Sequence, residues 1–383
     1  MTYANGIPEG YKATELGVLP EEWETVNFSD CFIHKKGKIP SHINTSNFQL
    51  TGKYPIVDQS TNYIAGYTDD ETKLFKEPLP VIIFGDHTRI FKFVDFPFAI
   101  GAQGTKIFIP NRELFDPQFL FYTLSNLEIP NRGYNRHSKL LNDYSIVKPP
   151  LPEQHAIATT LRTVQEAKEK TDAVIAATKV LKAAMMKHLF TKNTSKSFNY
   201  GEWKECRLGD VINLKRGYDL PNADRVFGPY PVISSSGVFS YHKEPKAKGP
   251  GVITGRYGTL GEVFYVEGDY WPLNTTLYVQ DFKGNNPRYI SYLLQTIKLG
   301  EQNFASSVPG VNRNILHQLI VQIPSIPAQE KIADIIHVID QKIAAEQSRK
   351  EALDTLFTSL LHDLMTAKIR VGYEGTPATK TSV

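Results

Sequence analysis

The residues that could carry out chemistry by themselves are few and poorly placed for it. Gly37-Lys38 lacks the upstream glycine and the following Ser or Thr of a phosphate-binding loop. Lys148-Pro-Pro-Leu151 has two prolines but not the Asn or Asp that an adenine methyltransferase motif would need. His137 and Ser138 could join Asp143 as hydrolase groups, but no nucleophile elbow accompanies them. The sequence therefore predicts no catalytic residue, no cofactor-binding residue and no metal ligand.

Polar and basic side chains gather instead in segments that we predict to be loops between strands, where they could contact DNA. Arg can fork onto guanine, Asn or Gln can pair with adenine, and Ser and Lys suit phosphates. In the first half of the chain the candidate DNA-binding residues are Lys35, Lys36, Lys38, Gln59, Ser60, Asn62, His87, Arg89, Gln103, Tyr134, Arg136, His137 and Lys139. In the second half they are Arg216, Tyr218, Ser234, Ser235, Ser236, Arg256, Tyr257, Asn274, Asn312 and Arg313. Solvated turns favour the same residue types, so any one of them could be an ordinary turn residue.

The two sets of loops match because the chain contains an internal repeat. Trp23 and Trp203 lie 180 residues apart, and Leu151-Pro-Glu-Gln154 lies 175 residues before Ile326-Pro-Ala-Gln329. Further landmarks keep their order, and small insertions in loops explain the drifting offset. The loop clusters occupy matching places yet differ in identity, as expected of two copies that read different sequences. We expect both tryptophans to be core anchors rather than DNA contacts.

Each repeat begins with short β-branched or aromatic runs, such as Val81–Phe84 and Gly251–Thr254, and ends in one long helix. Apolar residues along each predicted helix alternate in steps of four and three, which is the a/d pattern of a coiled coil. The predicted helix-pairing residues are Ile157, Leu161, Val164, Ile175, Ile332, Ile336, Ile339, Ile343, Leu353 and Leu360. Because both helices carry the pattern, we favour pairing between them. The alternative is that each helix lies on its own domain.

The predicted fold class is α+β, with two β-rich domains separated by a pair of long antiparallel coiled-coil helices in a pseudo-twofold repeat. The predicted boundaries are a first domain at 1–151, a central helix at 152–192, a second domain at 193–326, a C-terminal helix at 327–369 and a flexible tail at 370–383. A helix of roughly 38 residues spans about 55 Å at about 1.5 Å per residue. We therefore expect the helices to hold the domains apart, with both chain ends near the first domain.

The composition is that of an ordinary globular protein. The 383 residues are 41% hydrophobic and 22% charged, with a net charge of only +3, so positive charge for DNA must be placed locally. Cys31 and Cys206 match no zinc spacing and are expected to be reduced thiols. No signal-peptide pattern and no long apolar run occurs, so we expect a cytoplasmic protein without a membrane span.

Several stretches resemble the specificity (S) subunits of type I restriction–modification enzymes. Tyr11-Lys-Ala-Thr-Glu-Leu-Gly-Val-Leu-Pro-Glu-Glu-Trp23 is similar to the usual opening of the family's first target-recognition domain. Phe84–Arg89 and Gly255–Gly261 resemble the glycine-bearing turn of such a domain. Pro149–Gln154 and Ile323–Gln329 resemble the Pro-x-Gln entrances to the family's two long helices. The resemblance covers residues 11–369.

The resemblance implies a non-catalytic subunit that recognises double-stranded DNA. Each target-recognition domain would read one half of a bipartite site, and the helices would set the spacer and dock two methyltransferase subunits. Those partners would bind S-adenosylmethionine and methylate adenine, so no cofactor is expected on this chain. Two restriction translocase–nuclease subunits would complete the restriction form. One departure stands out, because Ala328 occupies the second helix entrance where the first has Glu153.

Other functions stay open at the level of sequence. The chain could be the targeting subunit of a related two-chain restriction–modification system whose partner fuses methyltransferase and nuclease. It could also be a protein scaffold that never touches DNA, or an enzyme whose active site has no known motif.

Overall fold

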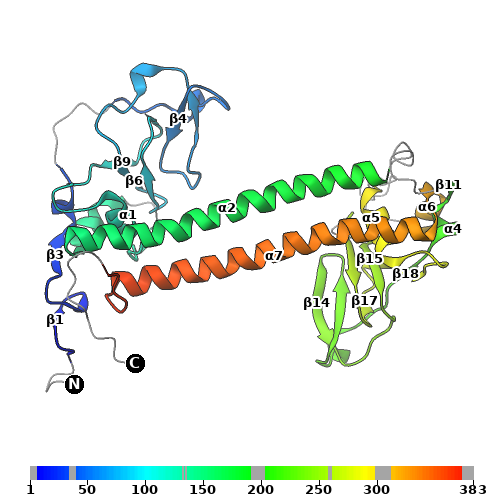
Figure 1. Ribbon diagram of the computed structural model, residues 1–383. Coiled ribbons are helices and arrows are strands. Elements are labelled where there is room, and N and C mark those ends of the chain that lie inside the picture. The colour runs from blue at the N-terminus through cyan, green and yellow to red at the C-terminus, as the bar shows by residue number, and fades with distance from the viewer. Residues whose placement is uncertain are drawn as a thin grey trace. The chain divides into compact units, whose positions relative to one another are not determined.

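The computed structural model describes residues 7–33, 40–131, 133, 136–190, 203–257, 261–297 and 312–372. The chain divides into two compact units: unit 1 is Met1–Lys170 with Lys350–Val383, and unit 2 is Thr171–Arg349. Each unit holds one β-rich domain and portions of two long helices (Figure 1). Among the described residues, no helix combines the length and apolar character needed to cross a membrane.

The β-rich domain of unit 1 is built from antiparallel pairs and two small sheets. β1 (Tyr11–Thr14) pairs with β2 (Gly17–Pro20), and β3 (Glu24–Asn27) pairs with β10 (Ser145–Lys148). One sheet places β4 (Tyr54–Val57) between β5 (Gly66–Thr68) and β8 (Ala99–Ile100), and the other places β6 (Val81–Gly85) between β7 (Phe91–Val94) and β9 (Thr105–Phe108). The helical elements are α1 (Pro117–Ser125) and the short 3-10 segments Phe28–Cys31, Thr45–Asn47, Glu71–Lys73 and His137–Asp143.

Unit 2 repeats this plan. β11 (Lys204–Arg207) pairs with β19 (Ile320–Ile323), and β13 (Tyr230–Ser234) lies between β14 (Gly237–His242) and β17 (Trp271–Pro272). A four-stranded sheet runs β12 (Asn213–Arg216), β18 (Thr276–Asp281), β15 (Gly251–Gly255) and β16 (Val263–Val266). Three short helices complete it, α4 (Leu208–Val211), α5 (Pro287–Thr296) and α6 (Arg313–Gln318), with a 3-10 turn at Asn222–Asp224. The matching order of elements confirms the predicted internal repeat and the α+β class.

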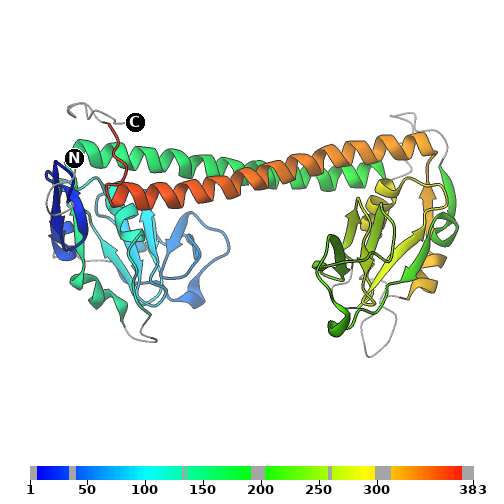
Figure 2. The ribbon, with the colours of Figure 1, turned by 90° about the horizontal axis from the view of Figure 1, so that it is seen from below.

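Two long helices, α2 (Leu151–Leu189) and α7 (Ile326–Met365), contribute to both units. They pair in antiparallel fashion, because Lys168 binds Asp354 at 2.7 Å in unit 1 and Lys182 binds Asp340 at 2.7 Å in unit 2. In both views most strands of each unit lie on one side of that unit's portions of α2 and α7 (Figures 1 and 2). The helices therefore cover the β-rich domains as well as each other.

The predicted seam residues are buried to different degrees. Ile157, Leu161, Ile332 and Ile336 are almost fully buried, and Ile175 is buried more loosely. The remaining predicted positions, Val164, Ile339, Ile343, Leu353 and Leu360, are half-buried. The fully buried ones pack into the domain cores: Leu161 shares a cluster with Phe84 and Leu364, and Ile332 shares one with Tyr289 and Leu189. Both sequence interpretations were thus partly right, since the helices pack on their own domains and on each other.

Each long helix is anchored at its entrance by the glutamine of its Pro-x-Gln motif. Gln154 Nε2 donates to the carbonyls of Pro149 and Leu114 at 2.8 and 3.0 Å, while its Oε1 accepts from the Asp116 amide at 2.9 Å. Gln329 Nε2 donates to the Pro324 carbonyl at 3.1 Å, and its Oε1 accepts from the Asn286 amide at 3.0 Å. Both glutamines are fully buried, so the motif ties each long helix to the N-cap of α1 or α5.

The C-terminal boundary differs from its prediction. α7 ends at Met365 rather than at residue 369, because Ala367 adopts a left-handed conformation with φ of 53° and turns the chain. The prediction that a flexible tail begins at residue 370 was wrong at Arg370. Its guanidinium binds Glu153 at 2.5 Å and Glu22 at 2.7 Å, which fixes this end of the chain to unit 1.

Candidate nucleic-acid interface

In unit 1, predicted DNA-binding residues from three loops meet near the ends of β4, β6 and β8. Gln59 Nε2 donates to the Gln103 carbonyl at 2.8 Å, and Gln59 Oε1 accepts from the His87 amide at 3.4 Å. The backbone carbonyl of Gln59 also accepts from the Thr88 hydroxyl at 2.6 Å. Gln103 and His87 have exposed side chains, and Gln59 is half-buried between them. Amides and an imidazole are thus presented together on a fixed backbone.

Gly85 makes this close approach of loops possible. A Cβ at Gly85 would lie 2.7 Å from the Gln59 carbonyl oxygen and 2.2 Å from the Thr88 hydroxyl oxygen, so any side chain would push the loops apart. Because Gly85 has no side chain, the loop that contains Gln59 can contact the loop that contains Thr88.

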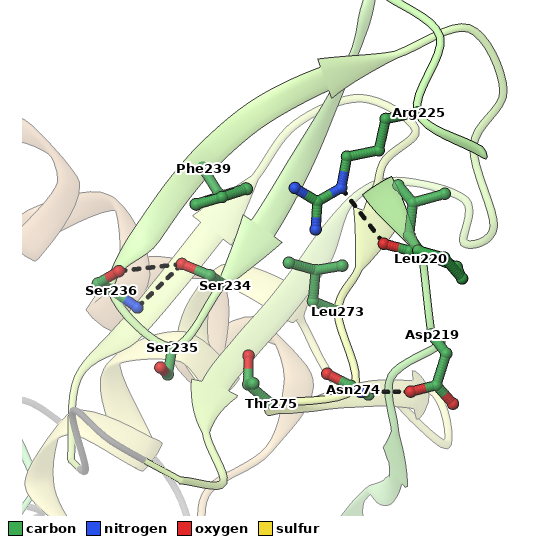
Figure 3. A pocket seen from close by; sticks show the side chains of 11 residues that line it. Asp219, Leu220, Arg225, Ser234, Ser235, Ser236, Phe239, Leu273, Asn274 and Thr275 are labelled. Atoms are coloured by element: carbon green, nitrogen blue, oxygen red, sulfur yellow. Dashed lines mark hydrogen bonds between the residues drawn. The ribbon is translucent and has the colours of Figure 1, made fainter. Parts of the chain in front are cut away.

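In unit 2 the corresponding loops surround a hollow of about 460 Å³ (Figure 3). Four of the predicted DNA-binding residues line it, Ser234, Ser235, Ser236 and Asn274. Ser234 Oγ lies 3.0 Å from Ser236 Oγ, and it accepts from the Ser236 amide at 3.2 Å. The hollow therefore offers hydroxyl and amide groups that can donate or accept hydrogen bonds.

Several residues that line this hollow were not predicted from the sequence, among them Asp219, Arg225 and Phe239. The Arg225 guanidinium carbon lies 5.0 Å from the centre of the Phe239 ring, and its Nε donates to the Leu220 carbonyl at 3.2 Å. Asp219 accepts hydrogen bonds from Asn274 and from Arg216, the latter at 3.2 Å. Phe239 could have been found from its alternation with Tyr241 on an edge strand, where both side chains are exposed.

The remaining candidates of unit 2 lie on the strand ends around the hollow or on α6. Arg256 stacks over Tyr257 with 4.5 Å from its guanidinium carbon to the ring centre. Tyr218 and Tyr278 share a hydrogen bond of 3.1 Å between their hydroxyls, and this bond lowers the pKa of Tyr218. Asn312 caps α6 by accepting from the Asn314 amide at 2.9 Å, while Arg313 is exposed.

Two candidates of unit 1 have structural roles. His137 is only 1% exposed, and its Nδ1 lies 2.7 Å from the carbonyl of Asp86. The prediction that His137 contacts DNA is therefore wrong for the folded domain, because the ring is part of the core. Arg89 adopts φ of 62° and donates from Nη1 to the Ile129 carbonyl at 2.8 Å, which ties it to the loop after α1.

The other candidates of unit 1 are scattered along its surface. Asn62, Arg136 and Lys139 are exposed, and Ser60 is half-buried with its amide donating to Asp58 at 2.8 Å. Lys35, Lys36, Lys38 and Tyr134 lie outside the described residues.

Within the described ranges, no cluster of three or more His, Cys, Asp or Glu is arranged to hold a metal ion. Cys31 and Cys206 are free thiols, and burial raises the pKa of Cys31 to about 12. The candidate interfaces of the two units instead present amide, hydroxyl and guanidinium groups on loops. Such groups suit recognition of DNA by hydrogen bonding.

Comparison with known proteins identifies the family to which this chain is similar. The family model described as "Type I restriction modification DNA specificity domain" matches residues 20–176 and again residues 200–355. The chain is 22% identical to the putative type I restriction enzyme MjaX specificity subunit of Methanocaldococcus jannaschii, over 95% of this chain and 97% of the relative. It is 23% identical to a putative type I specificity subunit of Mycoplasma genitalium, over 89% and 94%.

Solved structures share the fold. The crystal structure of the type I restriction–modification S subunit from M. genitalium matches with a TM-score of 0.69 at 20% identity, covering 89% of this chain and 96% of that one. A chain from a structural study of complex assembly in a type I system matches with a TM-score of 0.54 at 15% identity, covering 92% and 99%. With two matched domains that span most of its length, the chain belongs to the family of type I restriction–modification specificity subunits.

Proposed function

We propose that this specificity subunit reads a two-part DNA site, with the loops of unit 1 contacting one half and the hollow of unit 2 contacting the other. The observation that carries the proposal is the repeated scaffold with different side chains at equivalent loops. Gln59 in unit 1 corresponds to Ser235 in unit 2, because each lies two residues after the last residue of a matching parallel pairing, Val57 with Ile100 in unit 1 and Ile233 with Pro272 in unit 2. Gln103 likewise corresponds to Asn274, since the following Thr105 and Thr276 pair with Gly85 and Gly255. The two units thus have the same arrangement of strands but different hydrogen-bonding side chains at equivalent loop positions. This difference supports recognition of two different half-sites.

Asn274 and Arg225 are the proposed base-reading groups of unit 2. An amide can pair with adenine and a guanidinium with guanine, each good pair being worth about 1–3 kcal/mol of discrimination. Replacing Asn274 by Ala should relax the second half of the methylated motif and leave the first half unchanged. Sequencing of modified adenines in a host that carries the complete system measures both halves at once. A change in the first half would contradict the assignment.

The hypothesis for the spacer is that α2 and α7 act as a ruler. Each is a single helix whose residues belong to both units, so its length would fix how far apart the half-sites lie. Insertion of one heptad into both helices should lengthen the spacer of the recognised site by about three base pairs, because seven residues add about 10 Å at about 1.5 Å each. An unchanged spacer in the methylated motif would exclude the ruler.

The partners proposed for this chain are two methyltransferase subunits that hold S-adenosylmethionine and methylate adenine, with two restriction translocase–nuclease subunits in the cleaving form. Specificity subunits are non-catalytic members of type I systems, and this family membership supports that division of labour. Electrophoretic mobility shifts at low salt, with and without the adenine methyltransferase subunit, test it. A scaffold that never touches DNA would give no shift in either lane, whereas we expect a specific shift in the presence of the partner.

The two units should also be exchangeable. Replacement of residues 200–326 by the same stretch of a related subunit should exchange one half-site only. The methylated motif reports the outcome, and exchange of both half-sites or of neither would contradict the assignment of one unit to one half-site.

A further inference from the structure

Besides the hollow of unit 2, the structure has a cavity in unit 1. None of the predicted DNA-binding residues lines this cavity. It has a volume of about 700 Å³ and lies between β7, α1 and the two long helices. Its aromatic walls include Phe93, Phe121, Tyr122 and Phe357, and the carboxylates of Asp95 and Glu169 line it as well. We call this cavity the aromatic groove.

The charged residues that line the aromatic groove are Asp95, Glu169 and Lys92, so their net charge is negative. Burial together with the charges of Asp95 and Glu169 raises the pKa of Tyr63, which also lines the groove, to about 12. Glu169 accepts a hydrogen bond from Gln165 at 3.0 Å. Within the described ranges no Lys or Arg forms an ion pair with Asp95 or Glu169. A phosphate backbone would be repelled here, so DNA is a poor occupant.

Two lysines lie at the groove, and both are bonded to other groups: Lys92 lines it, and Lys168 lies over the ring of Phe357. Lys92 is buried, and its Nζ donates to the carbonyls of Asp58 and Asn62 at 2.7 and 2.5 Å. Lys168 binds Asp354 at 2.7 Å while lying over the Phe357 ring. Neither lysine supplies a counter-charge for Asp95 or Glu169.

The equivalent place in unit 2 can be identified from strand register. Val94 pairs with Val81 in unit 1, and Val266 pairs with Gly251 in unit 2, so Phe93 corresponds to Tyr265 and Asp95 to Glu267. The helices α1 and α5 both start with a proline after a capping Asp or Asn. Counting from that cap, Gln118 of unit 1 corresponds to Arg288 of unit 2.

In unit 2 this place is filled by the chain itself. The guanidinium carbon of Arg288 lies 4.5 Å from the centre of the Tyr265 ring. Its Nη2 donates to Glu267 Oε1 at 2.5 Å, and its Nη1 lies 2.9 Å from His337 Nδ1. The repeat thus holds an arginine between an aromatic face and a carboxylate, where unit 1 has a neutral glutamine beside a cavity.

We propose that the aromatic groove of unit 1 is a docking site for an arginine side chain of a partner polypeptide. Its aromatic faces and carboxylates match the guanidinium that unit 2 provides internally, and such contacts strengthen when they are shielded from water. The groove is much larger than a guanidinium, so the segment would also bury a neighbouring apolar side chain. The inference rests on the proposed function in one respect, because the partner is taken to be a protein subunit of the assembled complex.

Photo-crosslinking in the complete complex tests the occupant. A p-benzoylphenylalanine at Ser125, which lines the groove, should crosslink to a segment of a partner subunit that contains an arginine. No crosslink in the assembled complex, or a crosslink to DNA or to a segment without a basic residue, would overturn the proposal.

Charge variants of Gln118 provide the second measurement. Gln118→Arg copies unit 2 and should fill the groove from within, which weakens partner binding by about tenfold while the chain stays folded. The matched variant Gln118→Glu adds negative charge and should bind at least as tightly as the unchanged chain. Equal binding by both variants would overturn the inference. The proposed function fails separately, because a chain that is not a specificity subunit directs no motif-specific methylation even when unmodified.

Discussion

The two helix entrances differ in one charged network. In unit 1, Trp23 Nε1 donates to Glu153 Oε2 at 2.9 Å, and Arg370 binds the same carboxylate through two nitrogens at 2.5 and 2.9 Å. In unit 2, Ala328 takes the place of Glu153, and Trp203 Nε1 is buried without a hydrogen-bond partner among the described residues. The tryptophan survives in both copies, but its polar partner exists in only one.

This difference between the units indicates the role of each residue at the start of the long helices. Gln154 and Gln329 have similar roles, because each donates to the carbonyl of the residue five positions before it and accepts from the amide of a helix N-cap residue. Their second donor contacts differ, since Gln154 donates to the Leu114 carbonyl and Gln329 to the Asn285 side chain. Glu153 instead bonds Arg370, which lies just beyond the end of α7 and belongs to unit 1. We infer that the shared glutamines dock the long helices, whereas the Trp23–Glu153–Arg370 network fastens the C-terminal segment to the first domain.

Loss of Glu153 should have the largest effect. Glu153 is fully buried and accepts three hydrogen bonds, one from Trp23 and two from Arg370, so Glu153→Ala should destabilise unit 1 by about 3–5 kcal/mol. Hydrogen exchange read by mass spectrometry should show faster exchange in β3, β10 and residues 366–371, with no change in unit 2.

The control for that change is Glu22→Ala. Glu22 binds Arg370 from an exposed position, so its loss should cost less than about 1 kcal/mol. Similar protection losses in the two variants would mean that the buried carboxylate is not the centre of the network.

The glutamines should show equal effects in the two units. Gln154→Ala and Gln329→Ala each remove the partners of two acceptors and of one N-cap amide, which should cost about 2–3 kcal/mol in the unit concerned. Thr159→Ala, on an exposed face of α2, is the matched control and should change stability by less than about 0.5 kcal/mol. A large inequality between the two glutamine variants, measured by chemical denaturation with local exchange rates, would contradict their common role.

Replacement of the two tryptophans should affect the stability of the two units differently, with a smaller effect than the changes above. Trp23→Phe removes the indole donor from a buried carboxylate and should cost about 1–3 kcal/mol beyond the change in ring size. Trp203→Phe removes an N–H that has no described partner, so it should cost only the lost packing. Comparable losses in exchange protection for the two variants would show that ring packing, and not the Trp23–Glu153 bond, dominates.

The contrast between the units also marks how far the sequence could be interpreted. The repeat, the long helices and the Pro-x-Gln entrances were predictable, because they rest on local periodicity and on residue types with fixed chemistry. The sequence pointed to Ser234–Ser236 and Asn274 but not to Arg225 or Phe239, since pairing of β13 with β14 brings these together only in the folded domain. His137 was misread because its polarity suggested exposure, whereas a carbonyl 51 residues away satisfies the ring inside the core. The Arg370 network joins residues 217 apart and leaves no local signal.

His317 provides a pH-dependent contrast between the units. Its Nε2 accepts a hydrogen bond from the Leu214 amide at 2.9 Å, which requires an unprotonated nitrogen, and the equivalent position in unit 1 is Asn142. Burial, with the nearby charges of Arg313 and Lys283, lowers the pKa of His317 below its ordinary value of 6.5. The unfolded chain therefore binds the proton more readily than the folded one, so the stability of unit 2 should fall as the pH drops below about 6.5 and level off below the folded pKa.

The expected loss is about 1 kcal/mol, the value of one hydrogen bond. Hydrogen exchange of β12 at pH 7 and pH 5, corrected for intrinsic rates, measures this loss. His317→Gln, which keeps an acceptor but does not titrate, should remove the pH dependence of β12, and a dependence that survives in this variant would assign it to another group.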